Sequence, residues 1–287
     1  MIAALLLALG GALAEATELD VFFNASPSTA LTDCELPDVT ESAVMAGGLK
    51  VSLNPLVLSE DHWVLTNRFQ FHTLAADGDI LGALLGGPAR SLHGLFWQPG
   101  TKVRFAQRWS LVAFVRGGLY GDLVKGVGAR HFRTRGASWA QFTFKAPWTV
   151  GFGAAYAATP RGALVFPLIR ARYGGDRLKV AISLPQFAEI RAPLMNALLQ
   201  VGVALKLSSE SYSVRGAQVE DVVVTYRLAA LRPFLETRGG RFRLRANAGW
   251  AFWRKYALTD GAPSAGGASD PGWVFGFSAG YAPKYAP

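Results

Sequence analysis

The segment that decides the fold is Arg241–Trp253, RFRLRANAGWAFW, in which residue character alternates with a period of two. Its even positions are apolar, and its odd positions are basic, polar or small: Phe242, Leu244, Ala246, Ala248, Trp250 and Phe252 alternate with Arg241, Arg243, Arg245, Asn247, Gly249 and Ala251. In an α-helix the three arginines would spread around the circumference, whereas in a strand they lie on one face. The segment therefore predicts a β-strand with two different faces.

The same alternation recurs along most of the chain. It is clear in segments 62–72, 177–184, 197–208 and 273–281, and weaker in segments 49–53, 103–105, 109–119, 140–145, 150–156, 163–173 and 222–228. Glycine- and proline-rich turn signals separate many of these segments, and residues 261–272 form a longer Gly/Ala/Ser/Pro loop. No segment predicts a helix of ten or more residues, so the fold class is all-β.

Composition favours a membrane barrel over a soluble β-protein. Charged residues make up 17% of the 287 residues, below the roughly 25% of soluble domains. Several segments alternate for ten or more residues, and a spanning strand needs about 9–11. Aromatic residues gather near strand ends, as in the girdles of membrane barrels: Trp63, Trp109, Tyr120, Trp148, Tyr173, Trp250, Tyr256, Trp273 and Tyr281.

We therefore predict an antiparallel transmembrane β-barrel of 10–14 strands, with twelve as the best single estimate. A closed barrel leaves no unpaired strand edge, as the bilayer requires. The alternative is an exported soluble β-sandwich or barrel that binds ligands or envelope partners.

The N-terminus predicts an exported protein. Residues 1–14 are uncharged and rich in Leu and Ala, which is typical of a signal-peptide core. We place signal cleavage after Ala16, with Ala14 as the alternative, although the usual basic residue before the apolar core is missing. The domain prediction is a signal peptide over 1–16, an acidic N-terminal segment over 17–41 and the barrel over 42–287. Cys34, the single cysteine, is expected to be an inert thiol.

The charge of the chain is divided unevenly. Seven of its 20 acidic residues lie between Glu15 and Glu41, a stretch with no Lys or Arg. All 29 basic residues lie beyond it, together with the other 13 acids. Two interpretations remain open for the acidic segment. It either docks at the periplasmic mouth or in the lumen, near Arg241, Arg243 and Arg245, or it is a solvated tail.

The stretch from Ala163 to Arg215 resembles a known family. It contains the run ALVFPLIRARY at 163–173, the strand DRLKVAISLP at 176–185, and IRA at 190–192 before a further strand. In this order it resembles an uncharacterised family of Gram-negative outer-membrane β-barrel proteins, known as a domain of unknown function. Residues 249–260 are similar to the family's penultimate strand. The resemblance implies an outer-membrane barrel and brings no catalytic residues.

A search for enzyme chemistry finds no catalytic pattern. The four histidines (His62, His72, His93 and His131) match no metal-binding or nucleophile motif. We therefore predict a non-enzymatic protein with no catalytic, cofactor-binding or metal-binding residues and no nucleic-acid partner. A lipid- or polysaccharide-modifying barrel enzyme of the outer membrane is the alternative.

The functional prediction rests on basic residues expected to face the lumen. Rings of Arg and Lys favour anions in pores, so we expect either a passive, anion-favouring pore or a structural protein of the cell outer membrane. The expected partners are outer-membrane lipid, the barrel-assembly machinery, which would recognise Tyr281 or Tyr285, and small anionic solutes. The lumen candidates are Arg104, Arg108, Arg116, Arg170, Arg172, Arg177, Lys179, Lys206, Arg227, Arg241, Arg243 and Arg245.

Overall fold

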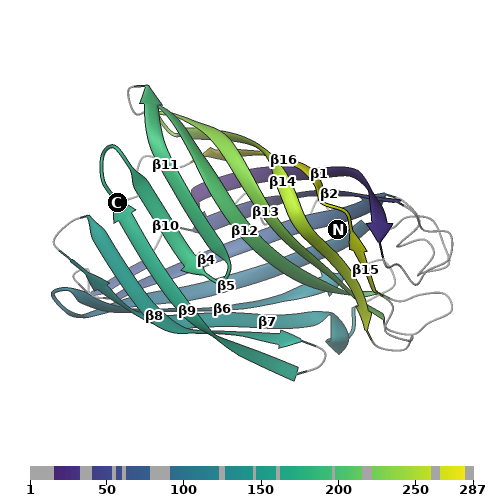
Figure 1. Cartoon of the computed structure of the whole chain (residues 1–287). Helices are drawn as coiled ribbons and strands as arrows, with labels where there is room; N and C mark the ends of the chain where they lie inside the picture. The colour runs from purple at the N-terminus through teal and green to yellow at the C-terminus, as the bar shows by residue number, and fades with distance from the viewer. Residues whose placement is uncertain are drawn as a thin grey trace.

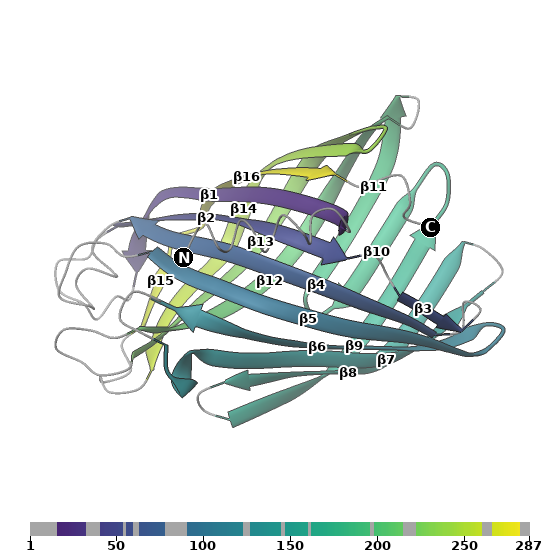
Figure 2. The same ribbon diagram turned by 180° about the vertical axis from the view of Figure 1, so that it is seen from behind.

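The strands of the chain form one sheet that closes into a barrel (Figures 1 and 2). The computed structural model describes residues 16–32, 41–53, 56–59, 63–77, 91–122, 127–144, 147–159, 162–195, 198–214, 222–259 and 266–281. A single closed sheet excludes the sandwich form of the alternative fold, in which two separate sheets pack face to face. Among the described residues, the sole helical element is the short η1 (Ala129–His131), and none of them forms a helix able to cross a bilayer.

Fourteen strands surround the lumen, each antiparallel to its neighbours, and β1 pairs with β16 to close the ring. Two short strands extend the wall: β3 (Leu56–Ser59) pairs with β4, and β15 (Gly266–Ser269) pairs with β14 and β1. The fourteen are β1 (Ala16–Thr32), β2 (Glu41–Leu53), β4 (Trp63–Asp77), β5 (Ser91–Ala106), β6 (Trp109–Gly121), β7 (Phe132–Thr143), β8 (Trp148–Thr159), β9 (Gly162–Gly174), β10 (Lys179–Leu184), β11 (Phe187–Met195), β12 (Leu199–Val214), β13 (Val222–Gly239), β14 (Phe242–Thr259) and β16 (Gly272–Tyr281).

The barrel class is confirmed, and the best estimate of twelve strands is wrong. Each of the predicted segments lies in one of the fourteen strands, and the two that sequence analysis missed are β1 and β11. Strand β1 lies in the stretch predicted as a separate acidic segment, but it pairs along its length with β2 and β16. Within the described residues, the barrel wall therefore includes β1 and extends into the stretch predicted as the separate segment 17–41. Residues 1–15, including most of the predicted signal peptide, and Cys34 lie outside the described residues.

The outer face of the barrel is an apolar belt. Large apolar side chains on every side of the barrel are exposed, among them Val21, Phe69, Val115, Phe152, Val165, Ile190, Leu231, Leu244 and Phe277. Aromatic pairs border this belt: Trp148 packs on Tyr173 with ring centroids 4.9 Å apart, and Trp250 on Trp273 at 5.5 Å. Tyr120 is an exception among the predicted girdle residues, because its side chain is buried inside the barrel.

The two ends of the barrel differ in their connections. At one end, called here the turn end, the strands after β4 are joined by two to four residues, as at 107–108, 144–147 and 240–241. At the opposite end, called the loop end, most connections are longer, such as 33–40, 78–90 and 215–221, and two connections, 160–161 and 185–186, have two residues each. The described chain begins and ends at the turn end, where Leu19 pairs with Tyr281. Membrane barrels show the same asymmetry, with short turns on the periplasmic side.

The wall is uneven at the loop end. The hairpin of β10 and β11 is short, so it ends well before β9 and β12 do (Figure 1). On the loop-end side of this hairpin, the end of β12 reaches β6, where Ser213 aligns with Gly121. Viewed from behind, β4, β5 and β6 run side by side as a continuous wall (Figure 2).

Candidate functional site

A cavity of about 500 Å³ lies inside the barrel. Its lining side chains come from strands on several sides: β1, β2, β4, β11, β12, β13, β14 and β16. The alternation seen in the sequence explains this arrangement, since each strand directs every second side chain into the lumen. The volume lies within the range of small-molecule sites, so this cavity is the candidate functional site.

An ion triad joins the first strand of the barrel to two other strands. The carboxylate of Asp20 on β1 is 2.9 Å from Nζ of Lys50 on β2 and 2.5 Å from Nη2 of Arg243 on β14. Strand β16 lies between β1 and β14, and its residue at this level is Gly280, which pairs with both Asp20 and Arg243. A side chain at position 280 would occupy the space that the carboxylate fills, because a Cβ there would lie 2.3 Å from Oδ1 of Asp20.

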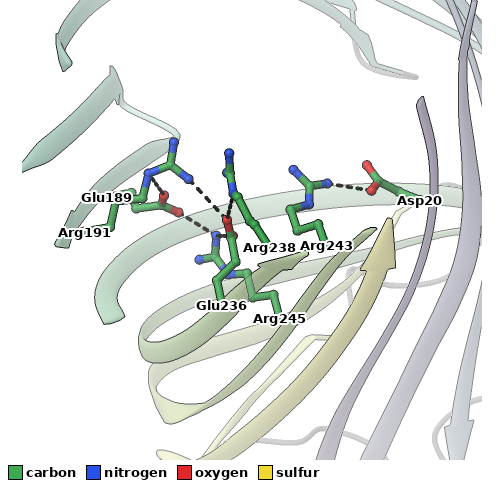
Figure 3. Close-up of polar contacts among 7 residues, drawn as sticks. All are labelled: Asp20, Glu189, Arg191, Glu236, Arg238, Arg243 and Arg245. Carbon is green, nitrogen blue, oxygen red and sulfur yellow. Dashed lines mark hydrogen bonds and ion pairs between the residues drawn. The ribbon is translucent and has the colours of Figure 1, made fainter. Parts of the chain in front are cut away.

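A second network joins two buried glutamates to three arginines (Figure 3). Glu236 on β13 contacts Nε of Arg238 at 2.7 Å, Nη1 of Arg191 at 3.5 Å and Nη1 of Arg245 at 3.8 Å. Glu189 on β11 accepts a hydrogen bond of 2.8 Å from Nη1 of Arg245. The side chain of Glu236 is only 2% exposed, so the arginines supply the polar partners that a buried carboxylate needs.

Cations outnumber carboxylates in these two networks. Five basic side chains meet three acidic ones: Lys50, Arg191, Arg238, Arg243 and Arg245 meet Asp20, Glu189 and Glu236. Lys206 and Arg232 also line the cavity, and Nη1 of Arg232 donates to Asn24 at 2.7 Å. The charges therefore give this part of the lumen a net positive balance.

An apolar layer packs inside the barrel toward the loop end. It consists of Val44, Leu74, Leu92, Phe96, Tyr120, Tyr212, Val214, Val222, Val224, Tyr226, Leu228, Ala230, Ala251 and Val274. A polar group is embedded in it: Glu210 accepts a 2.6 Å hydrogen bond from the hydroxyl of Tyr212 and lies 2.9 Å from Nε2 of His72. Several residues of this layer, such as Leu74 and Tyr226, also line the cavity. The layer thus forms part of the cavity wall on the side of the loop end.

The structure brings some of the predicted lumen residues together. Lys206, Arg243 and Arg245 line the cavity. Arg116 donates to Oε1 of Gln98 and lies over the ring of Phe96. Arg170 lies over Trp139, with Cζ 4.2 Å from the ring centroid.

Other predicted residues lie at the edges of the lumen. Arg172 faces the lumen because it lies two residues from Arg170 on β9. Lys179 faces the lumen because it pairs with Arg191 on β11. Arg104, Arg108, Arg177 and Arg241 are exposed at the turn end, where Arg241 donates to the hydroxyl of Tyr281 at 3.2 Å.

Arg227 does not face the lumen. It lies on the opposite face of β13 from Tyr226 and Leu228, which line the cavity, and it is exposed beside Lys255 on β14. The segment assigned around it was too short to fix its face from alternation alone.

Sequence analysis missed several functional residues. Asp20, Glu189, Arg191, Glu236 and Arg238 were not assigned to the lumen. A signal did exist for β13, because Arg232, Phe234, Glu236 and Arg238 continue its inward alternation. Pro233 obscured it, since proline in a predicted strand argues against a central position.

The family comparison agrees with this architecture. The profile of a family described as "Domain of unknown function (DUF6268)" matches residues 103–279, more than half of the chain. The chain belongs to this family. The DUF6268 match runs from β5 to β16 and includes Glu189, Glu236 and Arg245 of the charge networks. It confirms the predicted membership of an uncharacterised barrel family.

Several solved structures share a general barrel shape with this DUF6268 protein. The COG4313 outer-membrane channel from Pseudomonas putida F1 is 11% identical, with a TM-score of 0.49 over 93% of this chain and 95% of that chain. The P. putida toluene transporter TodX is 10% identical, with a TM-score of 0.42 over 93% of this chain and 90% of that chain. LpxR from Salmonella typhimurium is 8% identical, with a TM-score of 0.37 over 92% of this chain and 99% of that chain. At such scores the similarity says nothing about the function of this protein. No curated protein sequence matches the chain.

Proposed function

We propose that this DUF6268 protein is a non-enzymatic barrel of the Gram-negative outer membrane that admits small anionic solutes into its lumen. The exposed apolar belt and its aromatic borders support insertion in a bilayer. The short connections at the turn end support an orientation with that end in the periplasm. Assembly would then require the barrel-assembly machinery, with the end of β16 at Tyr281 as the recognition element.

The observation that carries the solute class is the charge balance of the cavity. Arg191, Arg238 and Arg245 share two carboxylates, and Lys50 and Arg243 share one. An anion entering the cavity meets cationic groups that are only partly neutralised, whereas a cation meets a net repulsion. The apolar layer packs against the cavity on the side of the loop end. We therefore expect a pore with low resting conductance that opens when the layer separates.

Planar-bilayer recording tests this proposal. The purified full-length protein is reconstituted, and the reversal potential is measured across a gradient of KCl. We expect a reversal potential displaced toward the chloride equilibrium potential. A displacement toward the potassium potential would contradict the anion preference. No conductance, even for a variant with a disrupted apolar layer, would favour a structural role.

The enzyme alternative has a separate test. Within the described part of the chain, no cluster of three or more His, Cys, Asp or Glu side chains could hold a metal ion. His72 is the histidine that lines the cavity, with Glu210 and Tyr212 as its partners. Mass spectrometry of outer-membrane lipid and polysaccharide incubated with the protein would detect a modifying activity, and a product lost in His72→Ala would overturn the non-enzymatic proposal.

A further inference from the structure

The barrel wall contains a gap between β9 and β12. Strand β10 pairs with β9 only from Ile169 onward, and β11 pairs with β12 only up to Lys206. The last backbone hydrogen bond of this side joins the amide of Leu207 to the carbonyl of Gln186. Beyond it, within the described residues, the strand segment Ala163–Leu168 pairs only with β8, and Ser208–Tyr212 pairs only with β13. Six residues of β9 correspond to about 20 Å of strand edge.

The gap is closed on its loop-end side by contacts across the barrel. Nη2 of Arg135 on β7 donates to the carbonyl of Ser209 on β12 at 2.9 Å. Nη2 of Arg133 donates to Oγ of Ser213 at 2.6 Å, and the amide of Asp122 donates to the Ser213 carbonyl at 3.4 Å. This bounded gap, called here the window, has the β10–β11 hairpin on its turn-end side, and on β12 only Ser208 lies between the Leu207 hydrogen bond and the Ser209 contact.

The outer rim of the window is apolar. Val165 and Ile169 on β9 are 73% and 45% exposed, and Leu184 and Leu207 on the facing strands are also exposed. These residues continue the apolar belt of the barrel. Unpaired backbone groups are costly in hydrocarbon, so a window at this level needs a reason to persist.

The inner surface beside the window is also apolar, unlike the charged cavity. Ala137, Trp139, Ala155 and Leu168 form a buried cluster on the lumen side of β7, β8 and β9, and Phe114 and Phe166 pack against it. Leu164 pairs with Ala157, and Ala157 pairs with Arg135, so these three side chains lie on the lumen side of the wall. Leu164 therefore extends the apolar surface into the window. An apolar surface thus runs from the belt past Leu164 to the lumen, bordered by the Arg135–Ser209 contact on the loop-end side and by Arg170 over Trp139 on the turn-end side.

We propose that this window is a lateral passage, through which a small lipophilic molecule moves between the bilayer and the apolar cluster inside the barrel. A water-soluble ion gains nothing from such a surface, whereas a molecule dissolved in the membrane exchanges one apolar environment for another. The inference goes beyond the proposed anion function and shares with it only insertion of the barrel in a bilayer.

Photolabelling of the full-length protein in phosphatidylcholine vesicles tests the passage. An apolar aryl diazirine is partitioned into the vesicles and activated, and mass spectrometry identifies the labelled residues. We expect label on belt residues such as Phe152 and also on the inner residues Phe166, Leu168 or Trp139. Leu164→Arg places a charge in the apolar window and is expected to lower the inner label about tenfold, because charged side chains are strongly disfavoured in apolar surroundings.

Leu198→Arg is the matched control. Leu198 is 58% exposed at the turn end, against 60% for Leu164, and its substitution should leave the inner label unchanged. Leu164→Gln serves if the arginine variant does not fold, as judged by heat-modifiable gel migration, and should lower the inner label less. Belt label without inner label would overturn the passage, as would inner label that persists in both Leu164 variants. Absence of belt label would overturn bilayer insertion, and with it both proposals.

Discussion

Arg243 and Asp20 form an ion pair of 2.5 Å across a strand that separates them. The residue between them is Gly280, whose missing side chain leaves the space that the carboxylate and guanidinium occupy. This pair connects the first strand of the barrel to the last long one. The pair also bears on the two interpretations of the acidic segment, a docked segment or a solvated tail. Asp20 does reach Arg243, but from within the wall and not from a docked leader or a tail.

Asp20→Asn is expected to weaken the barrel and to increase its anion preference. The substitution removes the counter-charge of both Lys50 and Arg243, and the lost charged hydrogen bonds lower the free energy of unfolding by about 1–3 kcal/mol. Reversal potentials should shift further toward chloride, most strongly at low salt, where screening is weakest. Identical reversal potentials for the variant and the parent would show that Asp20 does not influence the permeating ion.

Gly280→Ala tests the same pair without changing any charge. The added Cβ would lie 2.3 Å from Oδ1 of Asp20, so the carboxylate must move away from Arg243. Overpacking of this kind costs about 1–3 kcal/mol. We expect a lower midpoint in the heat-modifiable gel assay. Gly240→Asn is the control: no atom lies within 4 Å of the Cβ position at Gly240, and asparagine tolerates its positive φ of 58°. Equal midpoints for the two variants would contradict the steric argument.

Glu236→Gln is expected to destabilise the barrel more than the loss of an exposed acid. Three arginines surround this buried carboxylate, and removal of one partner from a buried ionic group costs about 3–5 kcal/mol. The midpoint of thermal unfolding should fall well below that of Asp270→Asn, whose parent side chain is exposed. Similar midpoints for the two variants would mean that water in the lumen compensates for the lost charge.

Tyr212→Ala is expected to raise single-channel conductance. The tyrosine is fully buried in the apolar layer and holds Glu210 through its hydroxyl. Truncation leaves a space of side-chain size on the axial path and lets water reach the cavity from the loop end. Tyr156→Ala, which removes a partly exposed tyrosine from the outer face of β8, should leave the conductance at the parent level. An unchanged conductance in Tyr212→Ala would place the barrier elsewhere.

The sequence predicted the strands whose two faces differ most in chemistry. In β14 the basic and apolar positions alternate without interruption from Arg241 to Arg245, so its inward face was assigned correctly. Strand β1 was missed because it lies within the acidic stretch from Glu15 to Glu41 and contains Ser26 and Pro27. Strand β11 was missed because it is short, and Pro185 and Pro193 border or interrupt it. These two omissions account for the difference between twelve strands and fourteen.

The charge networks could not be predicted from local patterns. Glu236 meets Arg191 because β13 and β11 lie on either side of β12, and Asp20 meets Arg243 because the ring closes between β1 and β16. Alternation places a side chain on a face but does not state which strands become neighbours. The window has the same origin: it depends on how far β10 and β11 extend relative to β9 and β12.

Closure of the ring between β1 and β16 has a consequence for the order of assembly. Leu19 and Tyr281 pair at this seam although almost the whole chain separates them, so bringing them together carries one of the largest entropic costs of any contact in the protein. Every other wall contact between successive long strands can form while the chain is still being inserted. The seam therefore forms last, and until it does the two edge strands β1 and β16 carry a row of unpaired backbone groups.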